Sequence, residues 1–346
     1  MTSGEANEIC LICVDAGTTN TRVWLTVGDQ VVARAQAGVG VRDTARDGSS
    51  ARLRNALRDL IKQVRDDARN LGLAQQPECV MAAGMITSPL GLAEIPHVES
   101  PAGLNDLAAV TRPHSFPEIT GLPILLIPGV RSGPRPCDQD TAGITDLMRG
   151  EETLVIGLGA LGLLKPRSTL LNLGSHWKVI KLDQEARIES SVTSMTGELI
   201  HTAQTQSILA SSVPPTRPTI IDHTWLEAGM REQRRSGLAR ALFCVRLLEQ
   251  GSDSSADQRL SFLIGAFLAS DMDAMVSRGL MDSEGAVVIT GGGVIAKAWR
   301  DALARLYMET VIVADAEAES ALLAGCRSVF SVLSDDHLTE NSLAPC

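Results

Sequence analysis

This sequence has few aromatic residues, no excess of basic residues and no metal-ligand residues at clustered spacing. Aromatics make up 3% of the 346 residues, with a single tyrosine. Acids outnumber bases by 41 to 31, and a net charge of -10 argues against a nucleic-acid partner, which needs a basic face. It does not exclude nucleotides, because a small pocket and a divalent metal can supply local positive charge.

Metal and disulfide patterns are also missing. The 6 histidines form no H-x-x-x-H, and none stands at zinc-finger spacing from a cysteine. The 7 cysteines are odd in number and scattered. Cys10 and Cys13 form a C-x-x-C, but they fall in a predicted strand, where a spacing of three points side chains to opposite faces. We therefore expect buried thiols in a reducing compartment rather than a zinc or redox site.

The common phosphate loops and targeting segments are absent as well. The chain contains no G-x-x-x-x-G-K-[ST], and no G-x-G-x-x-G opens a helix after a strand. The start, "MTSGEANE", lacks the basic and apolar regions of a signal peptide, and no uncharged apolar run reaches membrane-spanning length. We expect a cytoplasmic protein with no membrane partner. A chain of this length, 44% hydrophobic and 21% charged, suggests two globular lobes.

What the sequence does contain begins with "VDAGTTNTR" (14–22), directly after an apolar run. Apolar patterning predicts strands at 9–15, 21–27 and 30–36, the last two joined by a Gly-Asp hairpin signal. The motif is therefore predicted to be a turn within an antiparallel meander. A helix is predicted from Ser50 to Leu71, followed by strands within 79–84 and 124–129.

The second half repeats this opening. "TLLNLGSHWKVIKLD" (169–183) predicts another strand, glycine turn and strand. Helical patterns follow at 222–250 and 256–278, then a strand into three glycines, a helix from Val294, a short strand and a last helix near 316–328. We predict an N-terminal lobe at 1–148, a C-terminal lobe at 149–333 and a flexible tail at 334–346.

Both glycine turns suit a phosphate ligand. Backbone N–H groups at Gly17 and hydroxyls of Thr18 and Thr19 would meet phosphate oxygens, while Asp15 would hold Mg²⁺. The alternative is an ordinary turn whose aspartate caps its own backbone. The glycines Gly291 to Gly293 would let a base and ribose lie against bare backbone, or would simply form a tight strand-to-helix turn.

A third candidate feature is the pair Glu151 and Glu152 at the head of a predicted helix. One of these acids would accept the proton of an attacking hydroxyl. Alternatively, both are solvated acids that suit the helix dipole.

In this order the parts resemble the actin and hexokinase superfamily of ATP-binding proteins, and more closely the 2-dehydro-3-deoxygalactonokinase family of bacterial sugar-acid kinases. The resemblance covers roughly residues 9–329. It rests on "VDAGTTNTRVW", "AAGMITSPLGLAEIPHVESPAG" (82–103), "IPG" (127–129), "DLMRGEET" (146–153), "LGSHWKVI" (173–180) and "MTGEL" (195–199).

The resemblance implies an α/β fold of two ribonuclease-H-like lobes, the actin-like ATPase fold, with an interlobe cleft. It implies transfer of a phosphoryl group from ATP, with Mg²⁺, to the C6 hydroxyl of the small-molecule substrate 2-dehydro-3-deoxy-galactonate. For the nucleotide it implies Asp15 (also the metal ligand), Gly17, Thr18, Thr19, Gly174, Ser175, His176, Gly291, Gly292 and Gly293. Beside the sugar acid it implies Gly84, Met85 and Ser88, with Arg22, Arg149 and Lys178 as candidate cations for the carboxylate of the substrate. The implied catalytic base is Glu151, with Asp146 and Glu152 as fallbacks.

Several positions depart from the family pattern. Ala16 stands where an aromatic is expected, Leu92 where tryptophan is expected and His97 where tyrosine is expected. These changes affect the expected substrate more than the expected fold. Three alternatives remain open: a kinase for a related sugar acid, a phosphohydrolase of the same fold, and a non-catalytic, nucleotide-dependent assembly protein. The sequence does not decide the oligomeric state, for which a homodimer is one option.

Overall fold

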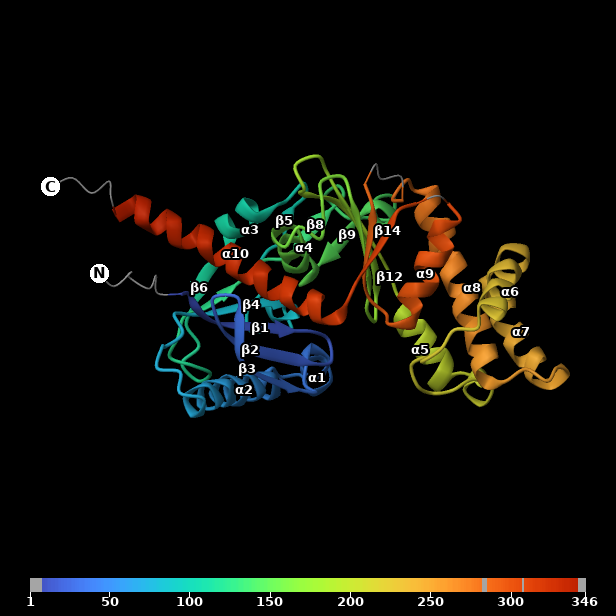
Figure 1. The fold of residues 1–346 in the computed structure, drawn as a ribbon, viewed down its shortest axis with the longest axis horizontal. Coiled ribbons are helices and arrows are strands. Elements are labelled where there is room, and N and C mark those ends of the chain that lie inside the picture. The colour runs from blue at the N-terminus through green and yellow to red at the C-terminus, as the bar shows by residue number, and fades with distance from the viewer. Residues whose placement is uncertain (1–7, 282–284, 307, 342–346) are drawn as a thin grey trace, which may run out of the picture. The chain divides into compact units, whose positions relative to one another are not determined.

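The structure is a computed structural model that describes residues 8–281, 285–306 and 308–341, with side chains through Ser334. The chain divides into two compact units, shown in Figure 1. Unit 1 takes in the chain up to Gly162 and again from Glu319, and unit 2 spans Leu163–Ala318. The division differs from the predicted lobes, because residues 149–162 and most of the final helix belong to unit 1.

Unit 1 is built on a six-stranded sheet with the order β3-β2-β1-β4-β7-β6. The first three strands form the predicted antiparallel meander, and β1 pairs in parallel with β4. These strands are β1 (Cys10–Ala16), β2 (Thr21–Val27), β3 (Gln30–Ala37), β4 (Val80–Gly84), β6 (Arg112–His114) and β7 (Ile124–Leu126). A second sheet, ordered β5-β8-β9, comprises β5 (Val98–Glu99), β8 (Val130–Ser132) and β9 (Asp146–Met148).

Helices cover both faces of the large sheet in unit 1. Side chains alternate along β1, so Cys10 packs in the core beneath α2 while Cys13 packs with Cys326 of α10 on the other face, which confirms the prediction for the C-x-x-C. Each buried leucine of α2 contributes about 1.5–3 kcal/mol. The helices of unit 1 are α1 (Val41–Asp47), α2 (Ala51–Asn70), η1 (Met85–Thr87), α3 (Leu104–Val110), η2 (Ala142–Ile144), α4 (Glu151–Ala160) and most of α10 (Asp315–Asn341).

The contact between α4 and α10 explains why the unit boundary differs from the prediction. A Cβ atom on Gly157 would lie 1.6 Å from the carbonyl oxygen of Ala321, and one on Gly325 would lie 2.0 Å from that of Thr153. The two helices therefore cross with their backbones in contact, a packing that only glycine permits. α10 also continues through Asn341, where the sequence predicted a flexible tail from Ser334.

Unit 2 repeats the sheet of unit 1. Its five strands have the order β12-β11-β10-β13-β14, with β10, β11 and β12 antiparallel and β13 parallel to β10. The order matches β3-β2-β1-β4-β7 in the sheet of unit 1. The repeat predicted from the two hairpins is therefore confirmed. The strands are β10 (Thr169–Leu173), β11 (Trp177–Leu182), β12 (Ile188–Ser194), β13 (Val287–Gly291) and β14 (Thr310–Val313).

The helices of unit 2 pack on one face of this sheet, with α6, α7 and α8 side by side (Figure 1). The predicted helical stretch 222–250 is two helices, because Gly237 breaks it with a φ of 81°. By length and composition α8 would suffice to cross a bilayer, but 67% of its apolar window is buried inside the protein. The helices are α5 (Thr196–Gln206), η3 (Ile208–Ser211), α6 (His223–Ser236), α7 (Leu238–Gly251), α8 (Ala256–Ser277) and α9 (Val294–Ala304).

Candidate functional site

The turn between β1 and β2 is held from behind by the start of α1. The carbonyl of Thr18 accepts a hydrogen bond of 2.9 Å from the amide of Arg42. A Cβ atom on Gly40 would lie 2.5 Å from that same carbonyl oxygen, so the close approach requires glycine. The backbone amides of Thr18 and Thr19 donate no hydrogen bond to any group in the part of the chain that the structure describes. These donors remain available for an anion.

Asp15 lies at the end of β1 beside two glycines from distant parts of unit 1. A Cβ atom on Gly84 would lie 3.1 Å from Oδ1 of Asp15, and one on Gly150 would lie 3.3 Å from the Cα of Gly84. Both glycines have positive φ, 91° and 109°, a conformation that L side chains rarely adopt. We call Asp15, Gly84 and Gly150 the Asp15 corner. The other oxygen of Asp15, Oδ2, accepts a 2.5 Å hydrogen bond from Arg22.

The two acids at the head of α4 have different environments. Glu152 is fully buried, and its carboxylate accepts hydrogen bonds of 2.7 and 2.9 Å from the amide of Gly150. Burial, with a smaller contribution from the charge of Glu151, raises the pKa of Glu152 to about 7. Glu151 is partly exposed, one residue from the Asp15 corner. The remaining predicted acid, Asp146, pairs with Ser132 at the end of β9 that is distant from α4.

Arg149 links the segment before α4 to the segment after β4. Its guanidinium donates to Oγ1 of Thr87 at 2.7 Å and to the carbonyl of Ile95 at 2.9 Å, and lies 3.4 Å from Nδ1 of His97. Burial lowers the pKa of Arg149. Thr87 in turn donates to the carbonyl of Gly84 at 3.1 Å, so Arg149 is connected to the Asp15 corner. The role of Thr87 was not predicted, although it lies within the 82–103 block.

The other residues predicted beside the sugar acid lie in the turn that follows Gly84. Met85 begins the short helix η1 and is half-buried. Ser88 is almost fully buried, and its hydroxyl donates to the carbonyl of Met85 at 2.7 Å. The structure thus brings Gly84, Met85 and Ser88 together with Asp15 and Arg149 in unit 1.

In unit 2 the second glycine turn is held by the start of α5. A Cβ atom on Gly197 would lie 2.3 Å from the carbonyl oxygen of Gly174, and the amide of Glu198 donates to the carbonyl of Ser175 at 2.7 Å. The carboxylate of Glu198 lies 3.1 Å from Nε2 of His176. These contacts give the "MTGEL" block a structural role that was not predicted. The arrangement repeats that of the first turn against α1.

The triple glycine lies next to this second turn. Gly291 pairs with Leu173, the residue before Gly174, across β13 and β10. The φ angles of Gly291, Gly292 and Gly293 are 71°, 75° and 55°. A Cβ atom on Gly292 would lie 2.8 Å from the side chain of Leu173, whereas one on Gly293 would meet nothing within 4 Å. A side chain at Gly293 would therefore point into open space.

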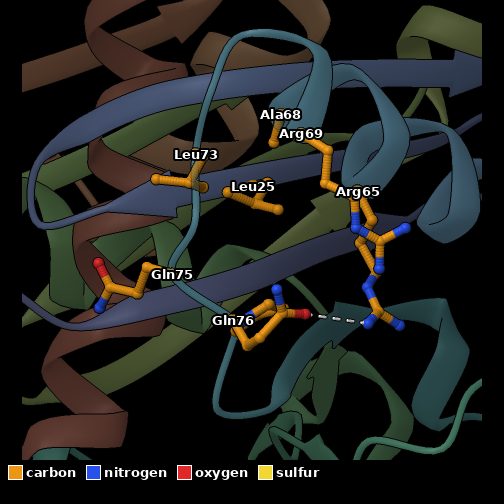
Figure 2. Close-up of a pocket in the computed structure, with 8 residues that line it drawn as sticks. Leu25, Arg65, Ala68, Arg69, Leu73, Gln75 and Gln76 are labelled. Carbon is orange, nitrogen blue, oxygen red and sulfur yellow. Dashed lines mark hydrogen bonds between the residues drawn. The ribbon is translucent and has the colours of Figure 1, made fainter.

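Two hollows in the described part of the chain lie away from these residues. Figure 2 shows one between the end of α2 and the segment after it, where Arg65 donates to Gln76 at 3.3 Å. Its volume is about 10 Å³, close to the lower limit for a single water molecule. A larger hollow, between α3, β7 and α10, is lined mainly by apolar side chains. Within the described ranges, no three His, Cys, Asp or Glu side chains are grouped to hold a metal.

Two units with the same strand order, each with a braced glycine turn after its first strand, define the actin-like ATPase fold. One solved structure of similar fold is the activator of 2-hydroxyisocaproyl-CoA dehydratase from Clostridium difficile, with bound ADPNP. It has a TM-score of 0.50 and 12% identity, with 98% of this chain and 99% of that chain covered.

The chain belongs to the 2-keto-3-deoxy-galactonokinase family, whose model matches residues 15–329, and it is therefore a sugar-acid phosphotransferase. The 2-dehydro-3-deoxygalactonokinase of Escherichia coli (strain K12) is 27% identical over 321 residues, covering 92% of this chain and 96% of the relative. A crystal structure of a Sinorhizobium meliloti protein assigned the same activity has a TM-score of 0.70 and 23% identity, with 92% of this chain and 97% of that chain covered. The family and the fold predicted from the sequence are confirmed.

Proposed function

We propose that this kinase transfers the terminal phosphoryl group of ATP to the C6 hydroxyl of 2-dehydro-3-deoxy-galactonate in the cytoplasm. The observation that carries the proposal is the Asp15 corner. It gathers a carboxylate, the turn with two unpaired amides and the head of α4 at the carboxyl ends of β1 and β4. Ligands of open α/β sheets bind at such ends.

Glu151 is our candidate for the catalytic base. It follows Gly150 directly and is partly exposed, so its carboxylate can accept the proton that leaves the C6 hydroxyl. Glu152 is fully buried against the amide of Gly150, which suits a residue that positions its neighbour. Asp146 lies at the other end of β9. Phosphoryl transfer needs mainly positioning and charge neutralisation, so a base that reaches the attacking hydroxyl is sufficient.

Each unit carries groups that suit a part of the nucleotide. In unit 1 the amides and hydroxyls of Thr18 and Thr19 suit phosphate oxygens. In unit 2 the turn Gly174–His176 suits phosphate as well, and the open backbone at Gly293 suits the adenosine. Lys178 is 4% exposed, and its register pair with Asn172 is separated from this turn by the pair Leu173 and Trp177. We assign Arg149 to the carboxylate of the sugar acid, because it is connected to the Asp15 corner.

Asp15 fits a magnesium ion that accompanies the nucleotide. Arg22 occupies its Oδ2, and Oδ1 faces the two glycines of the corner. Magnesium bound with phosphates needs only one or two protein carboxylates, so the lack of a three-residue cluster is compatible with it. When bound, the ion neutralises charge on the phosphates. Arg22 is then a partner of Asp15 rather than a ligand of the substrate.

The test is an ADP-release assay of the purified chain with ATP and a panel of sugar acids. The panel includes both C4 epimers of 2-dehydro-3-deoxy-hexonate, with plain hexoses as controls. We expect turnover with the galactonate-derived acid and slow ADP release when no acceptor is present. Full-rate release without acceptor would contradict the proposal and support a phosphohydrolase. Light scattering of the same sample gives its molar mass and so tests whether the protein is a homodimer.

A further inference from the structure

His97 has an orientation fixed by its neighbour. Its Nδ1 lies 3.4 Å from a guanidinium nitrogen of Arg149. A guanidinium has only N–H donors and cannot accept, so Nδ1 must be the acceptor of this contact. In a neutral imidazole the proton then resides on Nε2. Arg149 therefore makes His97 a donor at Nε2.

The charges around His97 keep the ring in this neutral form. The charges of Arg149, Arg135 and Arg131 act on the ring and disfavour its protonation, and the carboxylate of Glu99 acts in the opposite direction. Both Arg131 and Arg135 bind the Glu99 carboxylate. Burial and these cations lower the pKa of His97 to about 4, so the ring stays uncharged at neutral pH.

His97 is joined to the Asp15 corner through hydrogen bonds. Arg149 contacts Nδ1 of His97 with one nitrogen and donates to Thr87 with another, and Thr87 donates to Gly84 of the corner. A six-carbon chain spans roughly 6 Å between its first and last carbons, by standard C–C bond lengths. This is similar to the reach of an arginine side chain. The proposed function requires a sugar acid whose C6 hydroxyl meets Glu151 to bring its carboxylate to the guanidinium of Arg149, and these two residues flank Gly150 of the corner.

We propose that His97 is a specificity-determining residue whose Nε2–H donates a hydrogen bond to the acidic end of the sugar acid, beside the charge of Arg149. The proposal rests on the proposed function and deepens it, since it names the residue that would separate a sugar acid from a neutral sugar. A neutral donor next to a guanidinium binds a carboxylate without adding a second charge that must be desolvated.

The test compares two variants that differ in the donor. His97→Phe keeps a ring but removes the donor, and His97→Gln keeps an N–H near the position of Nε2. Because a hydrogen bond to a charged group is strong, we expect His97→Phe to raise KM for the sugar acid about 10- to 100-fold. Its kcat should change less than about threefold and its KM for ATP should stay at the wild-type value. His97→Gln should restore KM to within about fivefold of wild type.

Equal KM values in wild type and His97→Phe would overturn the proposal, as would equal losses in both variants or a matching rise in KM for ATP. A wild-type enzyme that phosphorylates no sugar acid would instead contradict the proposed function, so the two failures are distinguishable.

Nitrogen-15 NMR of the histidine-labelled wild-type protein does not depend on any variant. The chain has 6 histidines, few enough for assignment. We expect one neutral ring protonated at Nε2 throughout pH 6–8, whose Nε2 signal shifts when 2-dehydro-3-deoxy-galactonate is added and not when a neutral hexose is added. A ring protonated at Nδ1, or no shift with the sugar acid, would refute the role of His97.

Discussion

Asp15 and Arg22 are register partners on β1 and β2, and their side chains form an ion pair with an Oδ2–Nη2 distance of 2.5 Å. In unit 2 the matching positions hold Asn172 and Lys178, which are also register partners. Asn172 uses its Oδ1 to accept a 3.0 Å hydrogen bond from Thr290. The two hairpins thus share their backbone plan, but only the hairpin of unit 1 carries a carboxylate next to its glycine turn.

Replacing Asp15 by Asn should impair the use of Mg-ATP. The variant keeps the shape of the side chain but removes the charge that suits the metal, so we expect kcat/KM for ATP to fall about 100-fold or more. KM for the sugar acid should change little. Steady-state kinetics over a range of magnesium concentrations measures both effects.

Arg22→Gln is the matched control, because it breaks the same ion pair and keeps the carboxylate. The Arg22 side chain is 47% exposed, and exposed ion pairs contribute little, so its loss of activity should stay within about tenfold. If Arg22→Gln were as damaging as Asp15→Asn, the ion pair rather than the carboxylate would be the important feature.

Glu151→Gln should reduce turnover and leave ATP binding intact. Removal of a general base lowers kcat by about 10²- to 10⁴-fold, while a neutral glutamine fits the same space. Single-turnover kinetics and equilibrium titration with an ATP analogue separate the two quantities. Asp146→Asn serves as the control and should retain near-wild-type kcat. The opposite pattern, with the loss in Asp146→Asn alone, would transfer the role of base to Asp146.

Glu152 should make stability depend on pH. Its pKa in the folded protein is raised from 4.5 to about 7, so the folded state binds the proton more tightly than the unfolded state. The stabilising contribution is complete below pH 4.5 and is lost as the pH rises through 7. Because each pKa unit corresponds to about 1.4 kcal/mol, the free energy of unfolding should fall by about 3 kcal/mol across this window.

Glu152→Gln cannot ionise and should lack this fall. Denaturant unfolding at pH 5 and pH 8 measures the difference between variant and wild type, which should shift in favour of the variant at pH 8. Asp146→Asn keeps Glu152 and should follow the wild-type curve. Identical pH dependence in Glu152→Gln and wild type would mean that the carboxyl does not titrate in this range.

Gly197→Ala should weaken ATP use through the second turn. Its new Cβ would lie 2.3 Å from the carbonyl oxygen of Gly174, so the turn or α5 must shift. We expect KM for ATP to rise about tenfold, with a smaller change in KM for the sugar acid. Gly251→Ala is the control in the same unit, because its Cβ meets nothing within 4 Å. Similar kinetics for the two alanine variants would show that the contact does not hold the turn.

Elements with a strong local pattern were predictable. Periodic leucines defined α2, and apolar runs bounded by glycine turns defined both meanders. The short strands β5, β8 and β9 were not predicted, because two or three residues carry too little pattern. The break at Gly237 was missed for a related reason, since a glycine within a helical pattern reveals its φ only in the folded chain.

The candidate site was predictable as a set of residue types but not as a set of neighbours. Asp15, the glycine turns and the acids near 151 stand out by composition alone. That Glu151 is partly exposed while Glu152 is fully buried is decided by packing in the folded chain and not by the local sequence. Likewise, Thr87 and His97 gain significance only because Arg149, more than 50 positions later, contacts both.

By itself, the sequence determined the two glycine hairpins, the repeat that they define and the family to which the chain belongs, because each depends on residues close together along the chain. Only the tertiary structure decided that residues 149–162 and most of the last helix join unit 1, and that Gly84 and Gly150 meet at Asp15. The physical reason is that these features depend on close backbone contacts between distant segments. Local periodicity does not encode which glycine will lie against which carbonyl.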